Sequence, residues 1–181
     1  MKLLAISGSL RAASTNTVLV EALPALAPAG VEIVVWRGLG ALPHFNSDLH
    51  GDAIPAVREL RRLIGETDGL ILCSPEYAHG VAGVMKNGLD WLVPSLEFPE
   101  TPVTLLNASP NAHFAQAHIR ETLSVMQARI VEAACVSLPL QGRKLTVEDI
   151  VADESLAGAV RVALATFAEA IHALPPKQRW D

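Results

Sequence analysis

The chain has 181 residues, of which half are hydrophobic and 18% are charged, a composition typical of a globular protein rather than a disordered one. Its formal net charge of −5 disfavours nonspecific binding to nucleic acid, which requires a basic surface. No uninterrupted apolar run reaches the roughly 18–20 residues that span a bilayer. The first apolar run is short and stops at Ser7-Gly8, so the N-terminus does not have the pattern of a signal peptide.

The two cysteines, Cys73 and Cys135, lie far apart, and each belongs to the end of an apolar segment with high β propensity. We expect two reduced, buried thiols in a cytoplasmic protein, with no membrane or nucleic-acid partner. A redox-active pair is the less favoured alternative, because the Cys-x-x-Cys spacing of such pairs is absent from the sequence.

Short β-prone apolar runs alternate with longer segments whose apolar residues have helical spacing. Strands are predicted at Lys2–Ser7, Val31–Trp36, Gly69–Cys73, Pro102–Ala108 and Ile130–Leu138. Helices are predicted at Thr17–Leu26, Ala53–Gly65, Val81–Val93, His113–Ala128 and Glu154–Leu174, with Pro175-Pro176 ending the last. Gly38–Gly51 is expected to be a surface loop, and Gln141–Asp149 is a charged patch. This alternation predicts a three-layer α/β sandwich around a five-stranded parallel sheet, with residues 1–181 forming one domain.

Hydroxyl, amide and guanidinium side chains follow the first predicted strand and precede the first predicted helix. Backbone N–H groups and the positive end of a helix dipole point into the same space at such a turn. Side-chain donors are available from Ser9, Arg11, Ser14, Thr15, Asn16 and Thr17. The segment lacks both G-x-x-x-x-G-K-[ST] and G-x-G-x-x-G. It therefore favours a site for a terminal phosphate, the alternative being an ordinary helix cap.

A second unusual segment, S-P-E-Y-A-H-G-V-A-G-V-M-K-N-G-L-D-W, directly follows the buried third strand. In open α/β sheets, ligands bind beyond the carboxyl ends of the strands, where the strand order reverses. Pro75 and Gly80 favour a tight loop whose backbone lines a planar ring, and Tyr77 adds an aromatic edge. Both unusual segments are therefore expected at one site.

The pattern G-S-L-R-x-x-S-x-N together with P-E-Y-x-x-G-x-x-G-x-x-K-N-x-x-D-W resembles the NADPH-dependent FMN reductase family, which includes flavodoxin-like quinone, azo-dye and chromate reductases. The resemblance implies the strand order 2-1-3-4-5 and a noncovalent FMN that NADPH or NADH reduces. It also implies a small acceptor, such as free flavin, a quinone, an azo compound or a metal oxyanion. Carried over by position, the cofactor-binding residues are Ser9, Leu10, Arg11, Ser14, Asn16, Thr17, Pro75, Glu76, Tyr77, Ala78, His79, Gly80 and Ser109.

This reading assigns no catalytic side chain, because the cofactor carries the hydride chemistry. The chain departs from the family pattern at two places in this loop. It has Ala78-His79 where family members often have an asparagine, and Ala82 where they often have a proline. The loop Ser109–His113 lacks the frequent paired glycines, so Asn111 and His113 are expected to narrow access for nicotinamide or acceptor. An electron carrier served by a partner protein and a noncatalytic flavin-binding module stay open as alternatives.

Several side chains also have plainer interpretations. Glu76 is expected to form a structural ion pair, within the chain or across a subunit interface, and a catalytic role is the less favoured alternative. His79 is expected to contact either flavin or solvent. His113 and His118 do not share a helix face, so no metal site is expected. Apolar residues surround much of the helix Val81–Val93, which indicates burial of Trp91 in the core or in a homodimer. The resemblance extends that assembly to a homotetramer.

Overall fold

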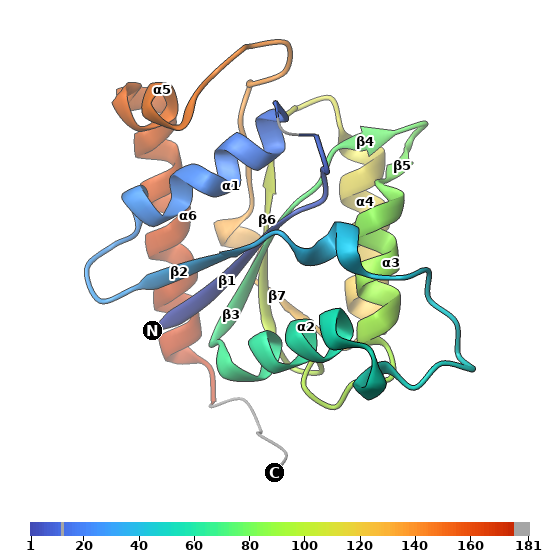
Figure 1. Cartoon of the computed structure of the whole chain (residues 1–181). Coiled ribbons are helices and arrows are strands. Elements are labelled where there is room, and N and C mark those ends of the chain that lie inside the picture. The colour runs from blue at the N-terminus through green and yellow to red at the C-terminus, as the bar shows by residue number, and fades with distance from the viewer. Residues whose placement is uncertain (12, 176–181) are drawn as a thin grey trace.

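The computed structural model describes residues 1–11 and 13–175, and a mostly parallel sheet forms its centre (Figure 1). The strand order is β2-β1-β3-β6-β7. The short strand β8 also pairs with β6, closer to the carboxyl end of β6 than β7 does. The main-sheet strands are β1 (Lys2–Ser7), β2 (Glu32–Trp36), β3 (Gly69–Cys73), β6 (Pro102–Asn107), β7 (Arg129–Ile130) and β8 (Val136–Ser137). This is the predicted flavodoxin-like order, with the fifth strand divided into two pieces.

The register places the ends of three central strands at one edge of the sheet. Ser7 at the end of β1 pairs with Cys73 at the end of β3, and Cys73 pairs with Leu106 of β6. All five residues of β3 are buried, as its uninterrupted apolar run predicts for a strand covered on both faces. The loops after β1, β3 and β6 therefore leave the sheet side by side.

Helices cover both faces of the sheet and complete the three layers (Figure 1). One apolar core includes residues of α2 (Pro55–Glu66), α3 (Gly83–Leu92) and α4 (His113–Val125). A second core, on the other face, includes residues of α1 (Thr15–Leu26), α5 (Val147–Ala152) and α6 (Glu154–Ala173). The predicted α/β sandwich is therefore confirmed, and the helices bury apolar residues in one of these two cores.

The predicted strand Ile130–Leu138 is wrong as a continuous element. A 3₁₀ turn at Glu132–Ala134 separates β7 from β8. At the break, the N–H of Leu105 in β6 donates to the Cys135 sulfur at 3.4 Å. A side chain thus replaces a ladder acceptor, and the Glu-Ala-Ala sequence suits a helical turn better than a strand.

Several boundaries also differ from the predictions. The helix expected at Val81–Val93 begins later because Gly80–Val81 forms β5, which pairs with β4 (Glu76–Tyr77) in a hairpin. Helix α4 ends before Ala128 because Gln127 adopts φ of 61°, a left-handed conformation that stops a helix. The surface loop Gly38–Gly51 contains a 3₁₀ turn at Gly38–Ala41.

The last two helices, α5 and α6, differ from the single C-terminal helix that the sequence predicts. Helix α5 was missed in the sequence, although Thr146 and Asp149 form a capping box at its start.

By length and hydropathy alone, helix α6 is long enough to cross a bilayer. Its buried face, however, packs in the second core around Val160, Leu164 and Phe167, as in a core helix. The helix ends at Ala173, and Pro176 lies outside the described residues.

Candidate functional site

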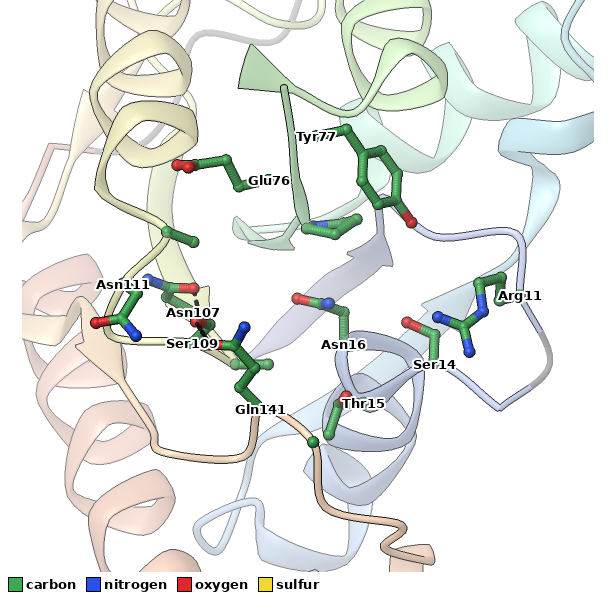
Figure 2. Close-up of a pocket in the computed structure, with 14 residues that line it drawn as sticks. Arg11, Ser14, Thr15, Asn16, Glu76, Tyr77, Asn107, Ser109, Asn111 and Gln141 are labelled. Atoms are coloured by element: carbon green, nitrogen blue, oxygen red, sulfur yellow. Dashed lines mark hydrogen bonds between the residues drawn. The ribbon is translucent and has the colours of Figure 1, made fainter. Parts of the chain in front are cut away.

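A pocket of about 400 Å³ lies beyond the carboxyl ends of β1, β3 and β6 (Figure 2). Its wall comes from four segments that are far apart in the sequence. The lining residues are Arg11, Ser14, Thr15, Asn16, Pro75, Glu76, Tyr77, Asn107, Ala108, Ser109, Asn111, Ala112, Gln141 and Gly142. The two unusual segments that follow β1 and β3 are therefore brought together at the point where the strand order reverses.

Close packing of two strand ends forms the base of this edge. The N–H of Gly8 donates to the Cys73 carbonyl at 2.7 Å, which continues the β1–β3 ladder by one residue. A Cβ atom at Gly8 would lie only 2.6 Å from Ser74 Oγ and 2.9 Å from Ser74 Cβ. Glycine at this position thus allows the loop after β1 to cross the loop after β3.

The amino end of α1 supplies hydrogen-bond donors to the pocket. Ser14 occupies the N-cap position but makes no side-chain hydrogen bond to the first turn of the helix. The N–H groups of this turn carry the positive end of the helix dipole. Arg11 and the side chains of Ser14, Thr15 and Asn16 gather around the same end in Figure 2. Such a donor set fits a phosphate group.

Ser9, Leu10 and Thr17 were predicted to bind the cofactor but do not line this pocket. They line a neighbouring cavity of about 310 Å³ instead. Thr17 Oγ1 lies 2.9 Å from Ser7 Oγ and donates to the Ser9 carbonyl at 3.4 Å, while the Arg11 N–H donates to Ser9 Oγ. In the structure these hydroxyls shape the loop that carries Arg11.

The hairpin β4–β5 forms the wall opposite that loop. Figure 2 shows the Tyr77 ring extending from the hairpin toward the loop that carries Arg11, and 53% of this residue is exposed. Glu76 lines the pocket, yet its Oε2 accepts a hydrogen bond from the Ala115 N–H in the first turn of α4 at 2.8 Å. Within the described part of the chain, Glu76 thus binds a helix terminus, and an ion pair across a subunit interface stays a prediction.

The tip of the hairpin points away from the pocket. Ala78 and His79 have φ of 49° and 57°, as the two central residues of a type I′ turn require. The His79 ring stacks on Phe114, with ring centroids 4.3 Å apart. Neither residue lines the pocket, and nor does Gly80, so their predicted cofactor contacts are not seen in the lining.

A chain of amide and hydroxyl groups forms the third wall. The Ser109 N–H donates to Asn107 Oδ1 at 3.1 Å, and Ser109 Oγ donates to Gln141 Oε1 at 2.7 Å. Asn107 Nδ2 in turn donates to Ser137 Oγ. Asn111 also lines the pocket, whereas His113 lines a separate cavity beside α4. Asn111 thus lies in the pocket whose access it is expected to narrow, His113 lies outside its lining, and the narrowing itself stays a prediction.

Some lining residues were missed from the sequence. Asn107 could have been predicted, because a polar residue at the carboxyl end of a buried strand is a candidate for ligand binding. Gln141 could not have been predicted, because it belongs to an irregular segment whose path depends on tertiary packing. The remaining missed residues, Ala108, Ala112 and Gly142, contribute small side chains or backbone.

Both cysteines are free thiols. Burial raises the pKa of the Cys73 thiol to about 12, against the opposing effect of a hydrogen bond from the Ala108 backbone. Burial likewise raises the pKa of Cys135 above its ordinary value. Neither thiol is therefore a good nucleophile near neutral pH. Within residues 1–11 and 13–175, no group of three or more His, Cys, Asp or Glu side chains is placed to hold a metal ion.

The K-N-x-x-D-W part of the second motif makes contacts that stabilise the fold. Lys86 forms an ion pair with Asp90, one helical turn away. Asn87 Nδ2 and Trp91 Nε1 both donate to the Pro43 carbonyl, at 3.0 and 2.8 Å. Only 1% of Trp91 is exposed. The protein's own loop therefore contributes to burying this tryptophan, which needs no partner subunit for its cover.

The family model described as NADPH-dependent FMN reductase matches residues 1–142. The chain belongs to this family. An NAD(P)H-dependent FMN reductase of Pseudomonas aeruginosa is 36% identical over 129 residues, which cover 68% of this chain and 69% of that protein. A quinone reductase of Escherichia coli strain K12 is 29% identical over 138 residues, covering 72% and 73% of the two chains.

A solved structure extends the likeness to nearly the whole chain. The flavoenzyme NAD(P)H:(acceptor) oxidoreductase FerB of Paracoccus denitrificans superposes with a TM-score of 0.77 at 27% identity, covering 95% of this chain and 97% of that one. Family, relatives and fold agree that this FMN reductase is an oxidoreductase that uses FMN and NAD(P)H. The resemblance read from the two sequence motifs is thereby confirmed.

Proposed function

We propose that the pocket of about 400 Å³ binds FMN with its phosphate at the amino end of α1. The observation that carries the proposal is the uncapped first turn, where Ser14 makes no local cap and its side chain lines the pocket. Arg11, Thr15 and Asn16 surround the same point and add a charged fork, a hydroxyl and an amide. These groups favour a dianionic phosphate over a neutral hydroxyl, since both the dipole and Arg11 attract negative charge.

The hairpin wall and the third wall would then hold the flavin ring between them. Pro75 and Tyr77 present a flat, partly apolar surface on one side, and Asn107, Ala108 and Ser109 lie on the other. A bound FMN would supply the hydride and electron transfer between NAD(P)H and an acceptor. The protein contributes position and polarity: the second Nδ2 hydrogen of Asn107 and the Ser109 hydroxyl oxygen offer hydrogen bonds to the polar edge of the ring.

The acceptor that we propose is a small, flat electrophile of the quinone or azo class. A quinone reductase of E. coli and an NADPH azoreductase of Bacillus are among the relatives, the latter 42% identical over 65 residues that cover 36% of each chain. Tyr77 is half exposed at the pocket mouth, where an aromatic acceptor can stack on it. Free flavin and metal oxyanions remain within the proposed acceptor range.

We also propose a cytoplasmic homodimer or homotetramer. Large apolar side chains are exposed on several elements, among them Val93 and Leu96 after α3 and Phe114 at the start of α4. Such residues favour contact with a second subunit. Light scattering on a size-exclusion column tests the assembly, since a monomer at micromolar concentration would contradict it. Cell fractionation tests the location.

Anaerobic reduction tests the proposed function. The purified protein is loaded with FMN, freed of excess flavin and mixed without oxygen with NADPH or NADH while visible flavin absorbance is followed. We expect rapid bleaching by at least one nucleotide and recovery of the absorbance when a quinone is added. Asn16→Ala provides the site control, and it should retain less FMN than the wild type.

Each other outcome contradicts part of the proposal. A yellow protein that neither nucleotide bleaches would instead be an electron carrier or a noncatalytic flavin-binding module. Failure of the wild-type protein to bind added FMN would overturn the proposed site itself. Bleaching without reoxidation by a quinone or azo compound would contradict the acceptor class.

A further inference from the structure

The side chains of Cys73 and Asn16 meet at the inner edge of the FMN reductase pocket. Cys73 is the last residue of β3, and none of its surface is exposed. Its Sγ lies 3.2 Å from Oδ1 of Asn16, the second residue of α1, which lines the pocket. The two residues are 57 positions apart, so this contact joins the strand-three edge to the proposed phosphate site.

The chemistry of the two groups fixes which one donates. The Asn16 Oδ1 atom is an acceptor only, so the Cys73 S–H group must be the donor. The sulfur stays in place because the Cys73 carbonyl accepts the Gly8 N–H at 2.7 Å, which anchors the strand end. The carboxamide of Asn16 is thereby held with its oxygen toward β3.

This orientation leaves the other end of the carboxamide available. Within the part of the chain that the structure describes, Asn16 Nδ2 has no protein hydrogen-bond acceptor. Asn16 stands in the first turn of α1, next to the uncapped N–H groups and Ser14. An NH₂ group here adds two donors to a site already suited to an anion. The opposite amide orientation would present an oxygen to the anion and repel it.

We propose that Cys73 is a positioning residue whose buried S–H group holds the Asn16 carboxamide so that its NH₂ end donates to the FMN phosphate. The proposal rests on the proposed function, which places that phosphate at the amino end of α1. Because burial keeps the thiol protonated at any pH near neutrality, the donor is present throughout the working range. Cys73 is thus a buried contributor to phosphate selectivity rather than a redox group.

The test compares FMN with riboflavin, which lacks only the phosphate. Dissociation constants for both are measured by flavin fluorescence in the wild type and in Cys73→Ala, Cys73→Val and Cys73→Ser, with circular dichroism to verify folding. The alanine and valine variants should bind FMN about threefold to tenfold more weakly, the loss expected for one hydrogen bond, with riboflavin affinity unchanged. Serine keeps a donor and should restore FMN affinity to near the wild-type value.

A merely structural role would give a different pattern. Equal weakening of FMN and riboflavin in Cys73→Ala and Cys73→Val, or no recovery in Cys73→Ser, would overturn the positioning role. The valine variant guards against a cavity effect, because it fills the space that alanine leaves empty and suits a buried strand.

Asn16→Ala separates this proposal from the one on which it rests. In that background, Cys73→Val should cause no further loss of FMN affinity, since the group that it positions is gone. If Asn16→Ala itself leaves the FMN-to-riboflavin affinity ratio unchanged, the phosphate lies elsewhere and the proposed function fails at that point. If Asn16→Ala lowers the ratio and Cys73→Val does not, only the role of Cys73 fails.

Discussion

Glu76 Oε2 accepts the Ala115 backbone N–H at 2.8 Å, so the pocket hairpin caps the helix that follows β6. Ala112, at the N-cap position of α4, offers no side-chain cap of its own. A carboxylate from another segment therefore satisfies the helix end and also complements its dipole. The contact fixes the hairpin wall against α4.

Glu76→Ala should accordingly lower the free energy of unfolding by about 1 kcal/mol, the usual value of a helix cap. Glu76→Gln keeps an acceptor and should lose about half as much, because only the charge is removed. Urea unfolding measures both variants. Glu169→Ala, at an exposed position of α6, is the control and should have almost no effect. Equal losses at Glu76 and Glu169 would contradict the capping role.

The hairpin tip contains residues poorly suited to its backbone. Ala78 and His79 both have positive φ, which asparagine and glycine tolerate far better. Ala78→Asn should therefore raise the free energy of unfolding by about 0.5–1 kcal/mol. Urea unfolding is the measurement, with Ala133→Asn as control at an exposed position of negative φ. A destabilised Ala78→Asn protein would contradict the assigned turn.

Gly8 should be intolerant of any side chain. A Cβ atom would lie 2.6 Å from Ser74 Oγ, so Gly8→Ala must push apart the loops after β1 and β3. Overpacking of this kind costs about 1–3 kcal/mol, and the displaced loops should also weaken FMN binding. Gly158→Ala in α6 is the matched control, because open space surrounds that site and alanine favours a helix. The control should gain stability by up to about 1 kcal/mol.

Calorimetry or urea unfolding distinguishes these two glycines. If Gly8→Ala unfolds at the same urea concentration as the wild type and binds FMN equally well, the close approach of the two loops does not matter for the site.

The Cys73 thiol predicts a loss of stability at alkaline pH. Its pKa is about 12 in the folded protein because of burial, against 9.0 when solvated. Above pH 9 the unfolded chain loses this proton while the folded protein keeps it, so stability falls as pH rises. Between the two pKa values, this titration lowers the free energy of unfolding by about 1.4 kcal/mol per pH unit. Below pH 9 it has no effect, because the thiol is protonated in both states.

Urea unfolding at pH 7 and pH 10 measures this effect. Cys73→Val removes the titrating group and should show a shallower decline than the wild type, while other titrating residues affect both proteins alike. Identical declines would contradict a buried, protonated thiol at the end of β3.

Much of this fold was predictable because its strands and helices differ in period. The all-apolar run of β3 and the helical spacing in α2 each specify an element without tertiary information. The break between β7 and β8 was only partly predictable: Glu-Ala-Ala favours a helical turn, but the break also depends on Cys135 reaching the Leu105 N–H from a distant part of the chain. Local sequence could not report that contact.

The site shows the same division. Arg11, Ser14 and Asn16 were predictable because a helix amino end recruits donors that are adjacent in sequence. Gln141 was not, because it reaches the pocket through its bond to Ser109, 32 residues away. Ala78 and His79 do not line the pocket because they form the two-residue turn of the hairpin, a position that depends on strand pairing.

The most direct measurement is the affinity of the wild-type protein and of Arg11→Gln for FMN and for riboflavin at constant ionic strength. The wild type should bind FMN at least about tenfold more tightly than riboflavin, and Arg11→Gln should remove much of that preference, since a charge-assisted bond contributes about 1.5–3 kcal/mol. Arg161→Gln, at an exposed position of α6, serves as the control. Equal affinity of the wild type for the two flavins would contradict a phosphate site at the amino end of α1.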